Sequence, residues 1–507
     1  MQHPRSLTWN AAANYIGLGY TTIIGIIVFP LYLQYLGPES FGLVGFFILL
    51  QSWAQLLDMG MSPLLSRQAA KARGLGIEFI ELKKLLRSLE LIFFVISLVV
   101  VISISAASEW IAASWLNAVS LSFSDVKACV ILMGIIIVLR FFSSLYRSGI
   151  QGMENQVWLN VSGVVLATVR FVGVLLVLQF ITQDIVSFFV YQLIVSVIEL
   201  TVLSIMFYHS MPLTEKLGIN FFWGTLKPTL PFAGGLAYSV VIWVLLTQLD
   251  KMVLSSVLSL SEYGYFALVA VIATGISQVS GPISQAILPR MTYLLSQGNN
   301  KDMLILYRRS TQIMVVIVLP LTGMIALFST ELLFAWTGDR AASDWAGPIL
   351  FWFALGNGIL AMNAFQYYLQ FAYGKLKIHV IYNTVLAIVQ IPLIIYVALE
   401  YGALAVAQVW FILRLIAFIL WTPIVHHMFV PGLHFPWLLK DIAPAFLLTT
   451  LLLMFIQSLN IGFDSMSRLE IFSLLTVIAI MVLIVNIVFS TESRKLVMSM
   501  IQAIKLK

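Results

Sequence analysis

The chain has 507 residues, of which 61% are hydrophobic and only 10% are charged. An average soluble protein carries about 25% charged residues, so this composition excludes a large soluble enzyme and indicates a polytopic membrane protein. The net charge is +6, and the single cysteine, Cys129, excludes an intramolecular disulfide.

Apolar segments recur along the whole chain and are joined by short connectors. The start of the chain carries no short apolar run with a small-residue cleavage site, so we expect the first segment to be a retained helix. A transmembrane helix needs about 20 predominantly apolar residues. We therefore predict an all-α polytopic membrane protein with about 14 transmembrane helices, at residues 10–36, 41–66, 89–112, 124–149, 156–181, 184–208, 229–251, 262–289, 309–330, 346–373, 378–399, 402–425, 438–459 and 469–490.

Lysine and arginine are distributed unevenly between alternate connectors. If both termini are cytoplasmic, most of these residues fall in cytoplasmic connectors, and the outer side holds only Lys127, Lys251, Arg340 and Arg468. The positive-inside rule then predicts a multi-pass membrane protein with both termini in the cytoplasm.

A weak internal repeat relates two parts of the chain. LYLQYLGPESFGLVGFF at 31–47 aligns with VLSSVLSLSEYGYFALV at 253–269, and each contains an aromatic residue followed by glycine. An even number of predicted spans separates the two segments, which gives parallel halves, a known transporter plan. We predict an N-lobe of spans 1–6 (residues 1–215), a C-lobe of spans 7–12 (216–430), and an appended pair, spans 13 and 14, with a basic amphipathic tail (431–507).

Three arginines fall near the middle of predicted spans, namely Arg140, Arg170 and Arg414. A charged side chain at the centre of an inserted helix costs about 2.5–3.5 kcal/mol, so these groups are not expected to face lipid. Two acids, Asp58 and Glu199, share the cytoplasmic half of the first bundle with the arginines. Two interpretations stay open: ion pairs with a purely structural role, or a cationic cavity that receives an anion.

Polar residues follow helical spacing on several of the same spans. Gln51, Gln55 and Asp58 recur in the second span, and Arg140, Ser144 and Arg147 share one face of the fourth. In hydrocarbon such groups need partners, so they point inward, although hydrogen bonds between helices alone could explain some of them. We predict a cationic lumen with Arg140, Arg147, Arg170 and Arg414 as substrate-binding residues, and with Asp58, Gln51, Gln55, Glu199, Asn14, Gln278, Gln366 and Gln370 as polar or charge-balancing residues.

Two further features concern a gate and the absence of enzymatic motifs. Asp250 and Lys251 lie together near the outer end of the seventh span and are candidates for a gate or a contact between lobes. The sequence has no phosphate-binding Gly-Lys loop, no HExxH motif and no nucleophile elbow. The six histidines have no cysteine or carboxylate to complete a metal site. We therefore predict no enzymatic activity, no cofactor, no metal and no nucleic-acid partner.

Several stretches together resemble a known transporter family. SLTWNAAANYIG, FPLYLQYLGPESFGLVGFF, LLDMGMSPLLSRQAAK and LLTQLDKMVLSSVLSLSEYGYFALVA are similar to the polysaccharide exporter, or lipid-linked oligosaccharide (O-antigen type) flippase, family of the multidrug/oligosaccharidyl-lipid/polysaccharide exporter superfamily. The resemblance implies two six-helix lobes that give alternating access to a central cationic cavity. It also implies an isoprenoid pyrophosphate substrate that carries a short glycan, for cell-surface polysaccharide synthesis.

Three alternatives remain. The multidrug branch of this superfamily often has an acidic residue in its first span, whereas residues 10–36 contain none. The lipid II flippase branch typically has several arginines in its first two spans, and here only Arg5 and Arg67 lie at their ends. A membrane enzyme such as a polysaccharide polymerase would need a sizeable outer loop, and the predicted outer connectors are short. Membrane lipids and other polysaccharide assembly proteins are further candidate partners.

Overall fold

The computed structural model describes residues 7–75, 79–211, 218, 220–490 and 492–494, and leaves undescribed the side chains of 7–16, 18, 73–75, 230–232, 282 and 284–286. The described chain is all-helical apart from one isolated bridge between Asn117 and Ser259. This result confirms the predicted all-α fold. The predicted basic tail falls largely on residues 495–507, which lie outside the described residues.

The helices divide into two compact units, Met1–Gly264 and Tyr265–Lys507. The elements of the first unit are α1 (Leu7–Ala54), η1 (Gln55–Asp58), α2 (Met61–Leu75), α3 (Phe79–Trp110), η2 (Ile111–Trp115), α4 (Phe123–Gly152), α5 (Gln156–Phe180), α6 (Ile185–Ser210), α7 (Trp223–Leu226), η3 (Lys227–Thr229) and α8 (Leu230–Val257). The boundary between the units falls within α9 (Leu260–Gln278).

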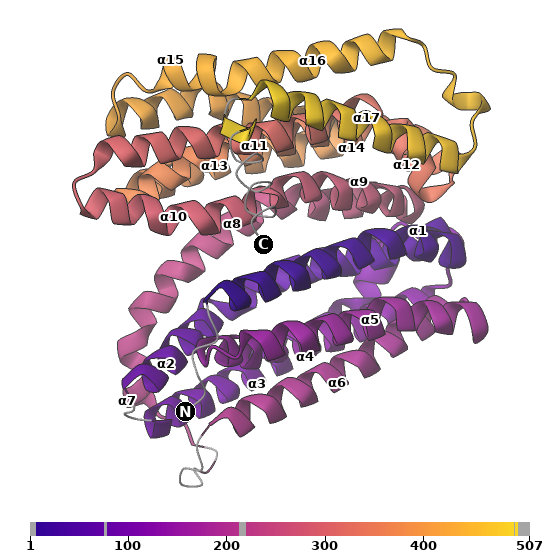
Figure 1. The fold of residues 1–507 in the computed structure, drawn as a ribbon. Coiled ribbons are helices and arrows are strands. Elements are labelled where there is room, and N and C mark those ends of the chain that lie inside the picture. Colours follow the sequence, from indigo (N-terminus) through magenta and orange to yellow (C-terminus); the bar gives the residue numbers. More distant parts are fainter. Residues whose placement is uncertain (1–6, 76–78, 212–217, 219, 491, 495–507) are drawn as a thin grey trace. The chain divides into compact units, whose positions relative to one another are not determined.

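Helix α4 occupies the centre of the first unit. It packs against α2, α3 and α6, while α5 packs against α1 and α6, so the long helices lie side by side (Figure 1). Aromatic rings fill the space between α3 and α4, where Phe93 and Phe141 stack with their centroids 4.0 Å apart. Such stacking adds to the free energy of area burial. This packing fixes the position of the polar face of α4 relative to α1 and α6.

The second unit contains most of α9 and the remaining elements, which are α10 (Ser280–Ser296), α11 (Asn300–Leu327), α12 (Ser329–Thr337), α13 (Arg340–Ala372), α14 (Lys377–Phe429), α15 (His434–Pro436), η4 (Trp437–Ile442), α16 (Ala443–Ser458), η5 (Phe463–Ser465) and α17 (Arg468–Phe489). Helix α13 packs against α11, α12 and α14, and the last two long helices, α16 and α17, pack against α11. A cluster of buried apolar side chains joins α11, α16 and α17, including Met324, Leu453 and Leu475.

Helix α8, which the sequence analysis assigns to the C-lobe, lies in the first compact unit. It packs against α1, η1 and α2, and the residue that begins α9, Leu260, donates its backbone N–H to the carbonyl of Asn117 at 3.0 Å. The predicted boundaries at 215/216 and 430/431 concern repeats in the sequence. They stay predictions.

Side-chain caps define where several helices begin. Ser122 accepts a hydrogen bond from the backbone N–H of Asp125 at the start of α4, and Asp184 accepts one from Ser187 at the start of α6. At α17, Ser467 and Glu470 form a reciprocal capping box. Each cap satisfies backbone donors that the first helical turn leaves without partners. Short connectors can therefore separate long apolar helices.

Twelve helices among the described residues are long and apolar enough to cross a membrane. Two of these candidate spans, Gly19–Asp58 and Lys377–Phe429, have 40 and 53 residues, against the roughly 20 that a bilayer requires. Each contains a glycine with non-helical backbone angles, Gly37 at φ 78° and Gly402 at φ 74°. Both glycines lie where one predicted apolar segment ends and the next begins.

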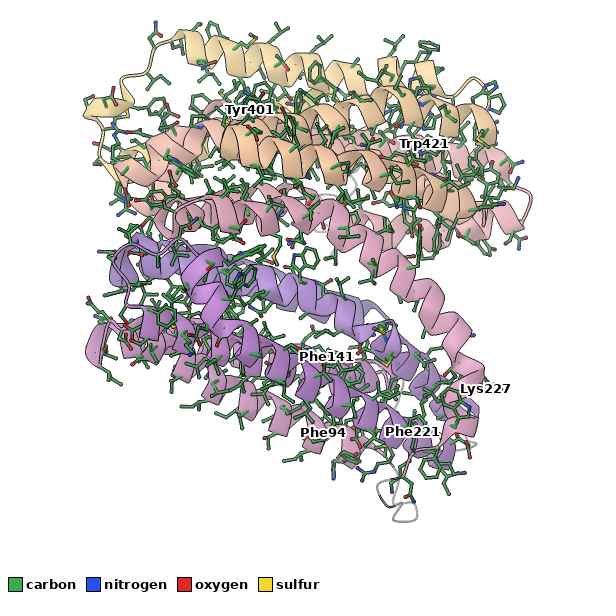
Figure 2. The ribbon with its side chains drawn as sticks, turned by 180° about the vertical axis from the view of Figure 1, so that it is seen from behind. Phe94, Phe141, Phe221, Lys227, Tyr401 and Trp421 are labelled. Carbon is green, nitrogen blue, oxygen red and sulfur yellow. The ribbon has the colours of Figure 1, made fainter. Side chains whose placement is uncertain are left out.

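Many large apolar side chains point outward. Phe94 on α3 is 58% exposed and Tyr401 on α14 is 65% exposed, and both project from the helices in Figure 2. Extended apolar surface of this kind is unfavourable in water and is expected where helices contact lipid. The composition, the candidate spans and this surface together describe a multi-pass membrane protein.

Candidate functional site

The polar face of α4 carries the centre of the candidate site. Arg140, Ser144 and Arg147 follow one another at steps of four and three residues, so the helix places them on one side. Arg140 lies near the middle of α4 and Arg147 lies nearer its C-terminal end. The neighbouring helices α1, α5 and α6 bring the partners of these arginines from other parts of the sequence.

The guanidinium of Arg140 donates hydrogen bonds to three uncharged groups. Nε reaches the hydroxyl of Ser196 at 3.3 Å and Nη2 reaches Oε1 of Gln192 at 2.9 Å, both on α6. Nη1 donates to Oε1 of Gln51 on α1. The ring of Phe47 lies 5.0 Å from the guanidinium carbon, at a distance typical of a cation–π contact. Neutral acceptors and a ring thus hold this cation in place.

Glu199 on α6 binds the other two arginines of the unit. Its Oε1 accepts a hydrogen bond from Nη2 of Arg147 at 2.9 Å, and its Oε2 accepts one from Nη2 of Arg170 on α5. The Glu199 side chain is 7% exposed, whereas those of Arg147 and Arg170 are 41% and 20% exposed. A single buried carboxylate therefore anchors two partly accessible guanidinium groups.

We call Arg140, Arg147, Arg170 and Glu199 the cationic cluster. Three guanidinium groups carry three positive charges and one carboxylate carries one negative charge, which leaves an excess of two positive charges. Arginine stays protonated in proteins, so deprotonation does not remove this excess. In a region of low dielectric constant, such an excess attracts anions strongly. The arrangement is chemically suited to a negative group.

The chain breaks at the segment that holds Asp58, which corrects one expectation. The sequence predicts a single helix over 41–66, whereas α1 ends at Ala54 and α2 begins at Met61. Met59 and Gly60 between them adopt left-handed angles, with φ 45° and φ 75°. Glycine adopts this conformation without steric cost and methionine does not, so the turn depends on its surroundings. The break aims the Asp58 carboxylate at the start of α2.

Asp58 pairs with hydroxyl and backbone groups of the new helix. Its carboxylate accepts a hydrogen bond from the backbone N–H of Ser62 at 3.1 Å and another from the Ser62 hydroxyl. The Ser62 hydroxyl also lies 3.3 Å from that of Ser144 on α4. Among the described residues no arginine lies within ion-pair distance of Asp58. Its predicted role in balancing the arginines stays a prediction.

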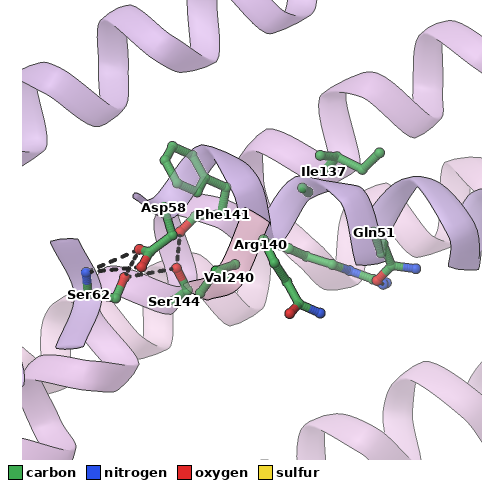
Figure 3. Close-up of a pocket in the computed structure, with 10 residues that line it drawn as sticks. Gln51, Asp58, Ser62, Ile137, Arg140, Phe141, Ser144 and Val240 are labelled. Atoms are coloured by element: carbon green, nitrogen blue, oxygen red, sulfur yellow. Dashed lines mark hydrogen bonds between the residues drawn. The ribbon is translucent and has the colours of Figure 1, made fainter. Parts of the chain in front are cut away.

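A cavity of about 320 Å³ connects these two sets of groups. Its lining comes from α1, η1, α2, α4 and α8 and comprises Gln51, Ala54, Gln55, Asp58, Ser62, Ile137, Arg140, Phe141, Ser144 and Val240. Figure 3 shows Asp58, Ser62 and Ser144 gathered at one side of the cavity and Arg140 with Gln51 at the other. The cavity therefore has a carboxylate–hydroxyl side and a guanidinium–amide side, with apolar walls.

The remaining predicted arginine, Arg414, belongs to α14 in the second unit. It is 3% exposed, and its guanidinium lies 4.7 Å from the centre of the Trp410 ring, one turn earlier on the same helix. Trp421, the other flanking indole, stacks on Tyr382 instead. Gln366 and Gln370 of α13 are buried beside each other and share a hydrogen bond, whereas Gln278 of α9 is exposed.

The other predicted residues occupy separate places. Asp250 is 1% exposed in α8, and Nζ of Lys251 lies 3.3 Å from its carboxylate. Neither residue lines the cavity described above. Gln55 does line it and is exposed. The side chain of Asn14 lies outside the described residues.

Sequence reasoning missed two residues of the site, Gln192 and Ser196. Both are buried on α6, and both accept hydrogen bonds from Arg140. Together with Glu199 they recur at steps of four and three residues, which is the same signal that identified the polar face of α4. A search for this spacing in the sixth span would have found them.

Comparisons of the sequence identify related proteins. Residues 7–295 match a family model described as "Polysaccharide biosynthesis protein". A Shigella flexneri protein described as a candidate O-antigen transporter is 21% identical over 410 residues, which cover 80% of this chain and 94% of that protein.

Comparisons of the structure identify proteins with the same fold. The lipid II flippase MurJ in an inward closed conformation matches with a TM-score of 0.72 at 16% identity, over 95% of this chain and 99% of that chain. An inward-facing multidrug resistance transporter of the MATE family matches at 0.62 and 13% identity, over 80% and 94%. The MATE multidrug transporter DinF-BH matches at 0.58 and 18%, over 84% and 96%. At these identities the likeness shows a shared fold.

Proposed function

We propose, because this chain belongs to the polysaccharide biosynthesis protein family, that it is a flippase for a lipid-linked oligosaccharide. The substrate is an undecaprenyl-pyrophosphate-linked oligosaccharide, and alternating access carries its head group across the cytoplasmic membrane. The product serves the synthesis of a cell-surface polysaccharide such as O-antigen, capsule or exopolysaccharide. One observation carries the proposal, namely the excess positive charge of the cationic cluster, whose Arg140 lines a cavity in the first unit.

The chemistry of the cluster suits a pyrophosphate. Guanidinium groups donate parallel hydrogen bonds to phosphate oxygens, and such charge-assisted bonds are roughly twice as strong as neutral ones. Arg140 is held by uncharged groups, and Arg147 and Arg170 share one carboxylate. An anion at this cluster would replace part of its hydration shell with fixed donors. The substrate's lipid tail needs no such site because it can remain in the bilayer.

The kinked helices support 14 membrane crossings. Helix α14 has 53 residues, which corresponds to a length of about 80 Å, whereas the hydrocarbon core of a bilayer is about 30 Å thick. If α1 and α14 each cross twice, turning at Gly37 and Gly402, the twelve candidate spans become 14 crossings. The even number keeps both termini on one side, and the distribution of Lys and Arg favours the cytoplasm.

The predicted roles of the individual residues follow from this proposal. Arg140, Arg147 and Arg170 contact the pyrophosphate in the first unit, and Arg414 is a separate predicted substrate-binding residue of the second unit. Gln51, Gln55 and Asp58 line its path, while Asp250 and Lys251 belong to the gate. A cation-coupled drug exporter is the weaker alternative, because residues 10–36 contain no carboxylate.

Translocation by the purified full-length chain in proteoliposomes tests the proposal. The substrate is an undecaprenyl-pyrophosphate-linked oligosaccharide with a fluorescent sugar, and a quencher that cannot cross the membrane measures how much label has moved. We expect protein-dependent movement, and we expect Arg140→Gln to slow it by about 10- to 100-fold through lost charge-assisted hydrogen bonds.

Two controls accompany this measurement. A phospholipid with the same label but no pyrophosphate should not move, and Arg140→Gln should elute from a size-exclusion column as the native protein does. Equal rates for the native chain and Arg140→Gln would contradict the cationic site. Export of a cationic dye without movement of the lipid-linked substrate would support the drug exporter instead.

A further inference from the structure

We infer that Gln51 is an exchangeable partner of Arg140, which a phosphate oxygen of the substrate displaces on binding. In the structure, the Gln51 amide oxygen accepts the hydrogen bond that Nη1 of Arg140 donates. An anion that enters the cavity takes this place, so that Gln51 holds Arg140 ready while the site is empty. The inference rests on the proposed function and adds how the site responds to its substrate.

Arg140 differs from the neighbouring arginines in the groups that accept its hydrogen bonds. Among the described residues, Arg140 donates its hydrogen bonds to the uncharged groups of Gln51, Gln192 and Ser196. Arg147 and Arg170 instead donate to the carboxylate of Glu199. A phosphate oxygen competes far better with a neutral amide than with a carboxylate, because the anion makes the stronger hydrogen bond. Arg140 is therefore the guanidinium whose partner is most readily exchanged.

The lining of the cavity indicates which of the three acceptors of Arg140 is exchanged. Gln51 and Arg140 both line the cavity of about 320 Å³, whereas Gln192 and Ser196 are 4% and 0% exposed and do not line it. The two α6 residues are also fixed from behind. Gln192 donates to the carbonyl of Arg170 at 3.3 Å, and the Ser196 hydroxyl donates to the carbonyl of Gln192 at 2.8 Å. An anion in the cavity thus meets Arg140 on the side of Gln51.

The exchange also changes how the end of α1 is held against α4. Gln51 lies in the last turn of α1, just before η1 and the left-handed residues Met59 and Gly60. The part of α1 before the kink at Gly37 is held separately, since Tyr32 donates to the carbonyl of Phe171 on α5 at 2.9 Å. Displacement of Gln51 therefore removes a hydrogen bond from α1 to α4 at the end of α1 that adjoins the break. Binding of the anion is coupled to release of this end from α4, so Gln51 is a positioning residue.

The experiment measures binding of inorganic pyrophosphate to the full-length chain in detergent by calorimetry. In Gln51→Ala, the anion no longer competes with an intramolecular acceptor, so we expect binding to be roughly two- to tenfold tighter, as expected for the net contribution of one hydrogen bond. In Gln51→Glu, a carboxylate occupies the same position, and we expect pyrophosphate binding to weaken by tenfold or more. Translocation of the lipid-linked substrate should slow in both variants, because the coupling to α1 is lost.

Controls keep the outcomes distinct. Gln457→Ala removes an exposed amide of α16 and should change neither binding nor translocation. If Gln51→Ala is not recovered as a folded protein, Gln51→Met keeps a side chain of similar length and also removes the amide that accepts from Arg140. Unchanged or weaker pyrophosphate binding in the folded variant, or equal effects of Gln51→Ala and Gln51→Glu, would overturn the inference.

The same measurements separate this inference from the proposed function. If the native chain neither binds pyrophosphate nor moves the lipid-linked substrate, the proposed function fails. If the native chain binds pyrophosphate and requires Arg140, while Gln51→Ala binds it with native affinity, only the role of Gln51 fails.

Discussion

Two clusters of charged side chains, one in each unit, are balanced in opposite ways. In the first, one carboxylate, Glu199, serves two arginines, and Arg140 has uncharged partners, so positive charge is in excess. In the second, the buried Asp441 of η4 accepts two hydrogen bonds from the Arg308 guanidinium, at 2.7 and 2.9 Å, and a third from Gln312. There one cation meets one anion, and no net charge remains.

This difference separates the proposed binding site from a structural joint. Arg308 lies in the first turns of α11 and Asp441 in the short π-helical segment before α16, so their pair connects two packed helices. A neutral, fully hydrogen-bonded pair has little attraction left for a third charge, whereas an excess of guanidinium groups has much. The ratio of cations to carboxylates is thus more informative than the presence of arginine.

The largest effect on stability is expected at the joint of the second unit. Asp441→Ala leaves Arg308 without its buried carboxylate, and breaking such a pair costs about 3–5 kcal/mol. The midpoint of thermal unfolding in detergent should fall markedly, while translocation per folded molecule should remain close to native. The matched control is Asp464→Ala, which removes an almost fully exposed partner of Arg340 and should be far milder. A selective loss of translocation in Asp441→Ala would erase the distinction between the two units.

Much of the fold and part of the site could be predicted from the sequence. The apolar segments predicted the helices, and even the kinks at Gly37 and Gly402 fall at predicted segment edges. Arg140 and Arg170 could be identified because a charge within an apolar span is costly and therefore rare, and Arg147 because it shares a helical face with Arg140. Such signals are local and need no knowledge of packing.

The pairing of the charges could not be predicted in this way. In the sequence, Glu199 and Asp58 are equivalent candidates for pairing with the arginines. The packing of α4 against α6 brings Glu199 to Arg147, whereas the break after η1 turns Asp58 toward Ser62. The break itself depends on the left-handed Met59, for which the sequence has weak local preference. Contacts between helices and a single unusual dihedral angle thus determine which carboxylate pairs with the arginines, and helical periodicity alone does not.

The next effect sharpens the comparison within the cationic cluster. Glu199→Gln removes the carboxylate, and the positive charges of Arg147 and Arg170 then repel each other, so we expect a loss of stability of about 2–3 kcal/mol. Pyrophosphate binding should become several-fold tighter because the cluster gains one net positive charge. Calorimetry and thermal unfolding measure the two effects on one sample. Weaker binding in this variant would mean that Glu199 orients the arginines more than it neutralises them.

A smaller effect is expected at a carboxylate of the first unit that resembles the structural joint. Glu90 on α3 accepts hydrogen bonds from Arg87, Tyr146 and Tyr208. Tyr208→Phe removes one donor and leaves two, so we expect a loss of about 1.5 kcal/mol and normal pyrophosphate binding. Tyr401→Phe removes the hydroxyl of a 65% exposed tyrosine and serves as the control. Impaired anion binding in Tyr208→Phe would extend the site toward α3.

The smallest effect is expected at an exposed pair, which tests whether burial is the property that matters. Lys127 lies 3.2 Å from Glu109, and their side chains are 37% and 71% exposed. Water and salt screen such a pair, so Lys127→Gln should change stability by less than about 1 kcal/mol and leave translocation unchanged. The difference in unfolding midpoint between this variant and the native chain should shrink further as the salt concentration rises. A loss as large as that of Asp441→Ala would show that the contrast between the two clusters does not depend on removing charges from water, because this pair forms the same kind of bond while exposed to solvent.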